Sequence, residues 1–86
     1  MSRTEQSDLL IADGLDEAFI GVAHRFGIYE PVAAYDREKC IEILMLTGMD
    51  RESAEEHFEY NIIGAWVGEQ TPIFIERLTL QEVGRN

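Results

Sequence analysis

The chain opens with a polar segment and then places apolar residues at helical spacing. Between residues 13 and 27 the spacing is i, i+3, i+4 and i+7, which is typical of a helix with one buried face. The stripe consists of Leu15, Ala18, Phe19, Val22, Ala23 and Phe26. Asp13 can cap the start and Gly27 can end it, so we predict a helix over about 14–26. Because Ile20, Val22 and Phe26 also alternate, a strand over 18–26 is the alternative.

Two more helical patterns occupy the middle of the chain. Asp36 is placed to cap a helix that runs through about Leu46. Asp50 is placed to cap another, which runs through about Ile63 and ends at Gly64. Only a few residues join these helices, so we expect them to pack as a hairpin.

Two short strands flank the helix pair. One is predicted over 32–35, opened by Pro31, and the other over 72–78. The order is then helix, strand, helix, helix, strand. It predicts a small single-domain α+β fold with the helices packed on a short two-stranded sheet. Residues 1–12 would form a flexible or docking N-terminal arm, residues 13–80 the domain, and residues 81–86 a polar tail.

The charge of the chain narrows the class of partner. Its 86 residues include 17 acids and only 7 lysines and arginines, which gives a formal net charge of −10. Such a chain repels nucleic-acid phosphates and anionic membranes, so we expect no direct binding to either and a basic protein as partner. The single cysteine, Cys40, excludes an intramolecular disulfide. The longest uncharged stretch is far shorter than a membrane span, and we expect a soluble, cytoplasmic protein.

Glutamates are concentrated on one face of the predicted helix that starts after Asp50. They are Glu52, Glu55, Glu56 and Glu59, at positions i, i+3, i+4 and i+7. Glu38 and Glu42 of the preceding helix would extend this acidic stripe. The stripe has the sign of a row of phosphates, so it could dock on the basic groove of a nucleic-acid-handling protein. The alternative is the solvated face of an amphipathic helix.

The segment 64–72 is the second candidate for partner binding. It holds two glycines and the only tryptophan, Trp66, with Glu69 close behind. An exposed tryptophan is a frequent interface anchor, whereas the alternative places Trp66 in the core and Glu69 in a turn. A weaker candidate is a polar site for a metal or small ligand, formed by Tyr35, Asp36, Asn61 and Glu69.

Four segments of the chain resemble a known group of proteins. They are DEAFIGVAHRFG (16–27), PVAAYDREKCIEILM (31–45), GMDRESAEEHFEYN (48–61) and GAWVGEQTPIFI (64–75). Together they resemble small accessory proteins encoded by tailed bacteriophages and prophage-like regions, and the last segment is the most specific. The resemblance implies a phage accessory protein acting in the cytoplasm of a bacterial host. It supplies no catalytic residue, because none is assigned in that group.

These observations favour protein binding over catalysis, and we predict no catalytic residue, metal or cofactor. The leading hypothesis is an acidic phage accessory protein that binds and inhibits a host nucleic-acid-handling or defence factor, as an anti-CRISPR protein or nucleic-acid mimic does. The alternative is a structural or assembly protein, acting as a homo-oligomer such as a homodimer or as a subunit of a phage or host complex. A third hypothesis, nucleotide sequestration, requires four cations to cluster: Arg25, Arg37, Lys39 and Arg77.

Overall fold

The centre of the fold is strand β4, Ile28–Asp36, which pairs with a strand on each side. The computed structural model describes residues 2–3, 9–25, 28–64 and 68–84. β3, Phe19–Arg25, lies antiparallel to β4, and β5, Ile73–Ile75, lies parallel to it, so the sheet order is β3-β4-β5. A separate small antiparallel pair is formed by β1, Ser2–Arg3, and β2, Leu10–Ile11.

The α+β class is confirmed, but the predicted first helix is wrong, and the alternative strand over 18–26 is the better prediction. The short 3-10 turn η1, Asp16–Ala18, is followed directly by β3. Leu15 and Ala18, the first two members of the predicted stripe, are buried as expected, at 4% and 2% exposed. After Ala18, the chain forms a strand and not a helix because it pairs with β4. The register between β3 and β4 shifts between Phe19 and Gly21, and such an irregularity interrupts strict alternation.

The sheet has three strands instead of two, and its last strand is short. β5 ends at Ile75, before the end of the strand predicted over 72–78, and a short helix, α3, Leu80–Val83, covers the start of the predicted polar tail. Pro31 lies inside β4 and not at its start. This position is tolerated because β5 pairs only with Ala34–Asp36, so Pro31 lies outside the part of β4 that has strands on both sides.

The predicted helix hairpin is present. α1 covers Arg37–Met45 and α2 covers Arg51–His57. Asp36 Oδ1 accepts from the Lys39 N–H at 3.2 Å, and Asp50 Oδ1 accepts from the Ser53 N–H at 2.8 Å, so both predicted caps are made.

The second helix continues beyond α2 as η2, Phe58–Ile63, which is π-helical. Gly64 ends it with φ −70°, so the glycine is not required by a left-handed conformation. It is required by close approach: a Cβ at this position would lie 2.9 Å from the carbonyl oxygen of Tyr60.

The core lies between the sheet and the helix hairpin. Cys40, Ile41, Ala54 and Phe58 are each fully buried. A row of rings ties the helices to all three strands: Phe19 to Tyr35 at 5.6 Å, Tyr35 to Phe74 at 5.7 Å and Phe74 to Phe58 at 5.1 Å between centroids. The N-terminal residues join this core, because the Ala12 N–H donates to the buried Tyr35 hydroxyl at 2.8 Å.

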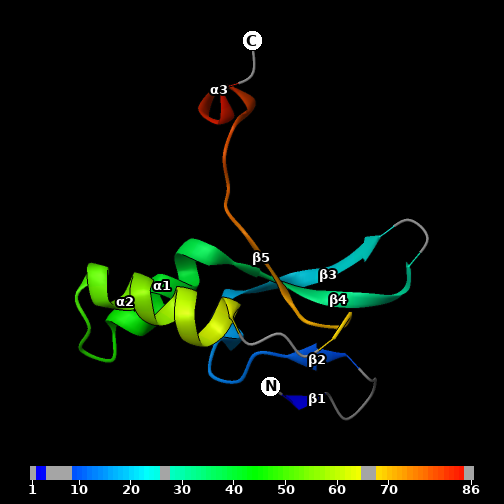
Figure 1. Ribbon diagram of the computed structural model, residues 1–86, viewed down its shortest axis with the longest axis horizontal. Coiled ribbons are helices and arrows are strands. Elements are labelled where there is room, and N and C mark those ends of the chain that lie inside the picture. Colours follow the sequence, from blue (N-terminus) through cyan, green and yellow to red (C-terminus); the bar gives the residue numbers. More distant parts are fainter. Residues whose placement is uncertain (1, 4–8, 26–27, 65–67, 85–86) are drawn as a thin grey trace.

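The C-terminal residues extend away from the sheet and the helix hairpin, which together we call the body (Figure 1). Figure 1 shows the chain running outward from β5 and ending at α3, away from the other elements. We call residues 76–84 the C-terminal arm. Its helix α3 is formed by a capping box between Thr79 and Glu82 and ends at Gly84 with φ 92°. The helix α3 is therefore built by local interactions, whereas the start of the arm is joined to the body by the ion pair of Arg77 with Asp36.

Candidate functional site

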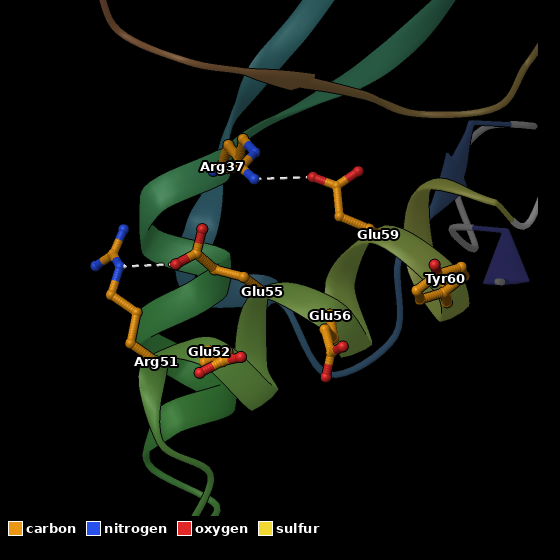
Figure 2. A pocket seen from close by; sticks show the side chains of 7 residues that line it. All are labelled: Arg37, Arg51, Glu52, Glu55, Glu56, Glu59 and Tyr60. Atoms are coloured by element: carbon orange, nitrogen blue, oxygen red, sulfur yellow. Dashed lines mark hydrogen bonds and ion pairs between the residues drawn. The ribbon is translucent and has the colours of Figure 1, made fainter.

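The structure brings the four glutamates of the predicted stripe to one open groove. They project from α2 and the first residues of η2 and line a hollow of about 600 Å³ (Figure 2). The spacing i, i+3, i+4, i+7 places them on one side of the helix, as predicted. The remaining lining residues are Arg37, Arg51 and Tyr60. We call this hollow the glutamate groove.

Arg51 links the groove to α1. Its Nη1 and Nη2 donate to the two carboxylate oxygens of Glu38 at 2.6 and 2.7 Å, and its Nε donates to Glu55 at 3.2 Å. This two-oxygen contact lowers the pKa of Glu38 and raises that of Arg51. Glu38 therefore joins the network of the groove through Arg51, although it does not line the hollow.

Arg37 holds the other end of the stripe. Its Nη2 donates to Glu59 at 2.9 Å, and this hydrogen bond raises the pKa of Arg37. The guanidinium also lies over the Phe58 ring, with Cζ 5.4 Å from the ring centroid. The Arg37 side chain is only 20% exposed, so its position is fixed by packing as well as by charge. Sequence reasoning named Arg37 only for nucleotide binding and missed its place beside Glu59, because that place depends on how the two helices pack.

Glu52 and Glu56 form no ion pair within the described part of the chain. Both are exposed, and both lie on the outer side of the groove in Figure 2. The groove lining has two more carboxylates than guanidiniums. It therefore offers an incoming cation two carboxylates held by arginines and two that are unpaired.

Tyr60 is the second residue of the groove that sequence reasoning missed. Its side chain is 80% exposed, because it follows the fully buried Phe58 by two residues and so lies on the opposite side of the helix. It follows Glu56 by four residues, a spacing that places the two side chains on one face. Among the described residues, Tyr60 is the aromatic side chain that lines the groove.

The other predicted residues do not line the groove. Glu42 and Glu38 border a second hollow of about 470 Å³ at the base of the C-terminal arm. Glu69 is exposed in the segment before β5, and its carbonyl oxygen accepts from Arg25 Nη2 at 2.9 Å. Trp66 lies outside the described residues.

The four cations named for nucleotide binding do not form one free cluster. Arg37, Lys39 and Arg77 line the second hollow, but Arg25 does not. Arg37 is paired with Glu59, and Arg77 Nε donates to Asp36 at 2.9 Å. Four acids line the same hollow: Asp36, Glu38, Glu42 and Glu76. An anionic nucleotide would meet this excess of carboxylates.

The hydrogen bonds of the four residues proposed as a polar site go to other residues and not to one another. The Tyr35 hydroxyl bonds to Ala12, Asp36 to Lys39 and Arg77, and Asn61 to His57 at 3.3 Å. No cluster of three or more histidine, cysteine or acidic side chains within the described ranges is arranged to hold a metal ion.

The comparisons with known proteins returned no relative. No family model matches the chain, and neither a curated protein nor a solved structure matches it. Among the helices of the described residues, none has the length and apolar character needed to cross a membrane. The case for a function therefore rests on the geometry of the groove.

Proposed function

We propose that this chain is a small acidic accessory protein that binds and inhibits a basic host protein, a nucleic-acid-handling or defence factor, by occupying the surface that would hold nucleic-acid phosphates. The observation that supports this proposal is the glutamate groove. It combines four carboxylates, only two of them paired with arginine, with one open aromatic ring. The resemblance to phage accessory proteins supplies the setting: a bacterial host cell.

The groove is ordered before a partner arrives. Glu55 and Glu59 are held by Arg51 and Arg37, so their side chains lose little freedom on binding. Glu52 and Glu56 are exposed and can pair with lysine or arginine of the partner. From Glu52 to Glu59 the stripe rises roughly 10 Å at 1.5 Å per residue. This length suits a short basic segment and not a whole duplex.

Tyr60 gives the groove a contact that a simple charged face lacks. An exposed tyrosine ring can stack on an arginine guanidinium, whose other donors then reach the neighbouring carboxylates. Arginine-rich segments of nucleic-acid-binding surfaces offer this combination of planar charge and donors. We therefore expect arginine to be preferred over lysine in the bound segment.

The proposal is tested with paired charge-reversal variants. Glu52→Lys with Glu56→Lys reverses the two unpaired carboxylates without breaking an ion pair. Asp16→Lys with Glu17→Lys makes the same change of net charge on η1, outside the groove. A fluorescent arginine-rich peptide is titrated by anisotropy with the wild type and both variants. We expect the groove variant to weaken binding by at least about tenfold and the η1 variant to change it far less.

A second arm of the experiment identifies the natural partner. Bacterial lysate is passed over immobilised wild type and both variants at low and at high salt. A nucleic-acid-binding or defence protein that the wild type and the η1 variant retain at low salt, and that the groove variant loses, supports the proposal. Equal loss in both variants would mean that net charge alone acts, and the groove would then have no special role.

A further inference from the structure

The C-terminal arm exposes apolar side chains that nothing in the body covers. Exposure rises along the chain from 38% at Ile73 and Ile75 of β5 to 49% at Leu78, 62% at Leu80 and 64% at Val83. Three of these residues lie on the arm, which stands away from the body in Figure 1. A small domain seldom places its apolar side chains on a projecting segment, so this pattern indicates a missing contact.

The strand from which the arm leaves also has an open side. β5 is an edge strand, and within the described residues no further strand pairs with it. Phe74 stacks on Tyr35 in the core, so Ile73 and Ile75 point to the opposite face of the sheet. An unprotected edge flanked by exposed isoleucines is a surface on which another segment can pack.

The exposed surface area of the molecule indicates how much area a partner could cover. The chain exposes 6304 Å², whereas a compact monomer of 9.8 kDa exposes about 5,200 Å². Its radius of gyration is 14.0 Å, against about 12 Å for a compact domain of 86 residues. The excess of about 1,100 Å² is comparable to the roughly 800 Å² that each partner buries in a standard stable interface.

The charges of the arm favour a second copy of this chain over a basic partner. The arm, residues 76–84, contains two acids and one arginine, so it carries only −1 in a chain of net charge −10. β3 and β5 contain no acid at all. Two copies can therefore meet along this side without bringing their glutamates together.

We propose that two copies form a two-fold dimer in which each C-terminal arm packs along β5 of the other copy and covers its Ile73 and Ile75. In a two-fold interface each contact occurs twice, so the arm of each copy covers the open edge of β5 of the other copy. The arm is long enough to make this contact. Four extended residues and one helical turn span about 20 Å, and the molecule is 20 Å thick.

The test measures mass against concentration with the full chain. Sedimentation equilibrium from about 1 to 100 μM should give a dimer for the wild type. Leu80→Gln with Val83→Gln should weaken the dimer by at least about 100-fold while the circular dichroism spectrum is unchanged. Leu46→Gln is the matched control, because Leu46 is 84% exposed at the other end of the molecule, and it should leave the dimer intact.

Two results would overturn the proposal. One is a wild-type chain that stays monomeric at the highest concentration, which would leave the arm for a different partner. The other is a dimer that survives both the Leu80/Val83 variant and a chain ended after Arg77. The dimer interface is apolar, so it should persist at high salt, whereas peptide binding in the glutamate groove should be lost there. Failure of either proposal is thus seen separately from the other.

Discussion

The helix hairpin and the side of the molecule formed by β5 and the C-terminal arm differ in what they expose. α1 and α2 with η2 carry six glutamates, and the hairpin is held together by arginine bridges and a continuous core. β5 and the arm expose isoleucine, leucine and valine and carry almost no net charge. One surface suits a charged partner at low salt, and the other suits an apolar partner at any salt.

This difference teaches that a strongly acidic chain need not be acidic everywhere. A net charge of −10 describes the whole molecule, but β5 and the arm, residues 73–84, contribute only −1 of it. Binding experiments on such a protein separate the two surfaces by salt alone. The predictions that follow alter the two regions in turn, beginning with the residue that joins them.

Phe58→Ala should produce the largest loss of stability. Phe58 is fully buried, packs on Phe74 of β5 and lies beneath Arg37, so it joins the helix hairpin to the sheet. Truncation to alanine should lower the free energy of unfolding by about 3–5 kcal/mol, measured by urea denaturation. Tyr60→Ala, two residues later and 80% exposed, should cost under about 0.5 kcal/mol. Similar losses in both variants would mean that the ring of Phe58 does not join the two regions.

Alkaline pH should weaken the core beneath α1. Burial raises the pKa of the Cys40 thiol to about 11, whereas an unfolded cysteine titrates near about 8.5. Between these values the unfolded chain loses its proton first. Rising pH therefore lowers the free energy of unfolding, by up to roughly 3 kcal/mol. Burial also raises the pKa of Tyr35, which acts in the same direction above its ordinary value.

Cys40→Ala separates these two contributions. It should flatten the fall in stability between about pH 8.5 and 10, where the thiol acts and the tyrosine does not. Urea unfolding of both proteins across that range is the measurement. An unchanged slope in the variant would assign the effect to another group.

The two helix caps allow the base of the arm to be compared with the helix hairpin. Asp50→Ala removes only a cap, whereas Asp36→Ala removes a cap and the ion pair with Arg77 at the start of the arm. Each should cost about 1 kcal/mol, with Asp36→Ala larger by up to about 0.5 kcal/mol. Thermal or urea unfolding measures both. A larger loss from Asp50→Ala would show that the Arg77 contact adds nothing.

The smallest effect on stability should come from Arg51→Gln. It removes exposed ion pairs to Glu38 and Glu55, which solvent screens and which contribute little to stability. Because Arg51 lowers the pKa of Glu38, the loss should be present near neutral pH and vanish as the pH falls through the pKa of Glu38 in the folded protein. The same variant makes the groove more negative and should strengthen binding of the arginine-rich peptide at low salt. Weaker binding would show that Arg51 is needed to position Glu55.

Local signals predicted the helix hairpin well. The caps at Asp36 and Asp50 and the end at Gly64 depend on residues close in sequence, and all three were found. The periodicity of residues 18–26 allowed both a helix and a strand, and pairing with β4, which the pattern of one segment does not report, favours the strand β3. α3 was missed although Thr79 and Glu82 have the spacing of a capping box and Gly84 follows.

The candidate site was predicted only in part, because the pattern of one helix does not report which residues of other elements pack beside it. Helical spacing placed the four glutamates together, but Arg37 reaches them from the neighbouring helix, and only tertiary packing brings it there. Tyr60 follows Glu56 by four residues, so helical spacing also predicts its place beside the stripe, but the stripe was defined by charge alone. Glu42 was predicted to extend the stripe and borders the second hollow instead, whereas Glu69 was predicted as part of the separate segment 64–72.

The π-helical segment η2 bears on how this surface can change during evolution. A π-helix holds more residues in a turn than an α-helix, so the segment 58–63 has room to lose one residue and close as a regular α-helix. Because the wider turn absorbs the extra residue, the residues on either side of such a deletion would keep their faces. The segment could therefore change its length by one residue without moving the glutamates of α2. Lineages could vary the chain length beside the acidic face while keeping that face.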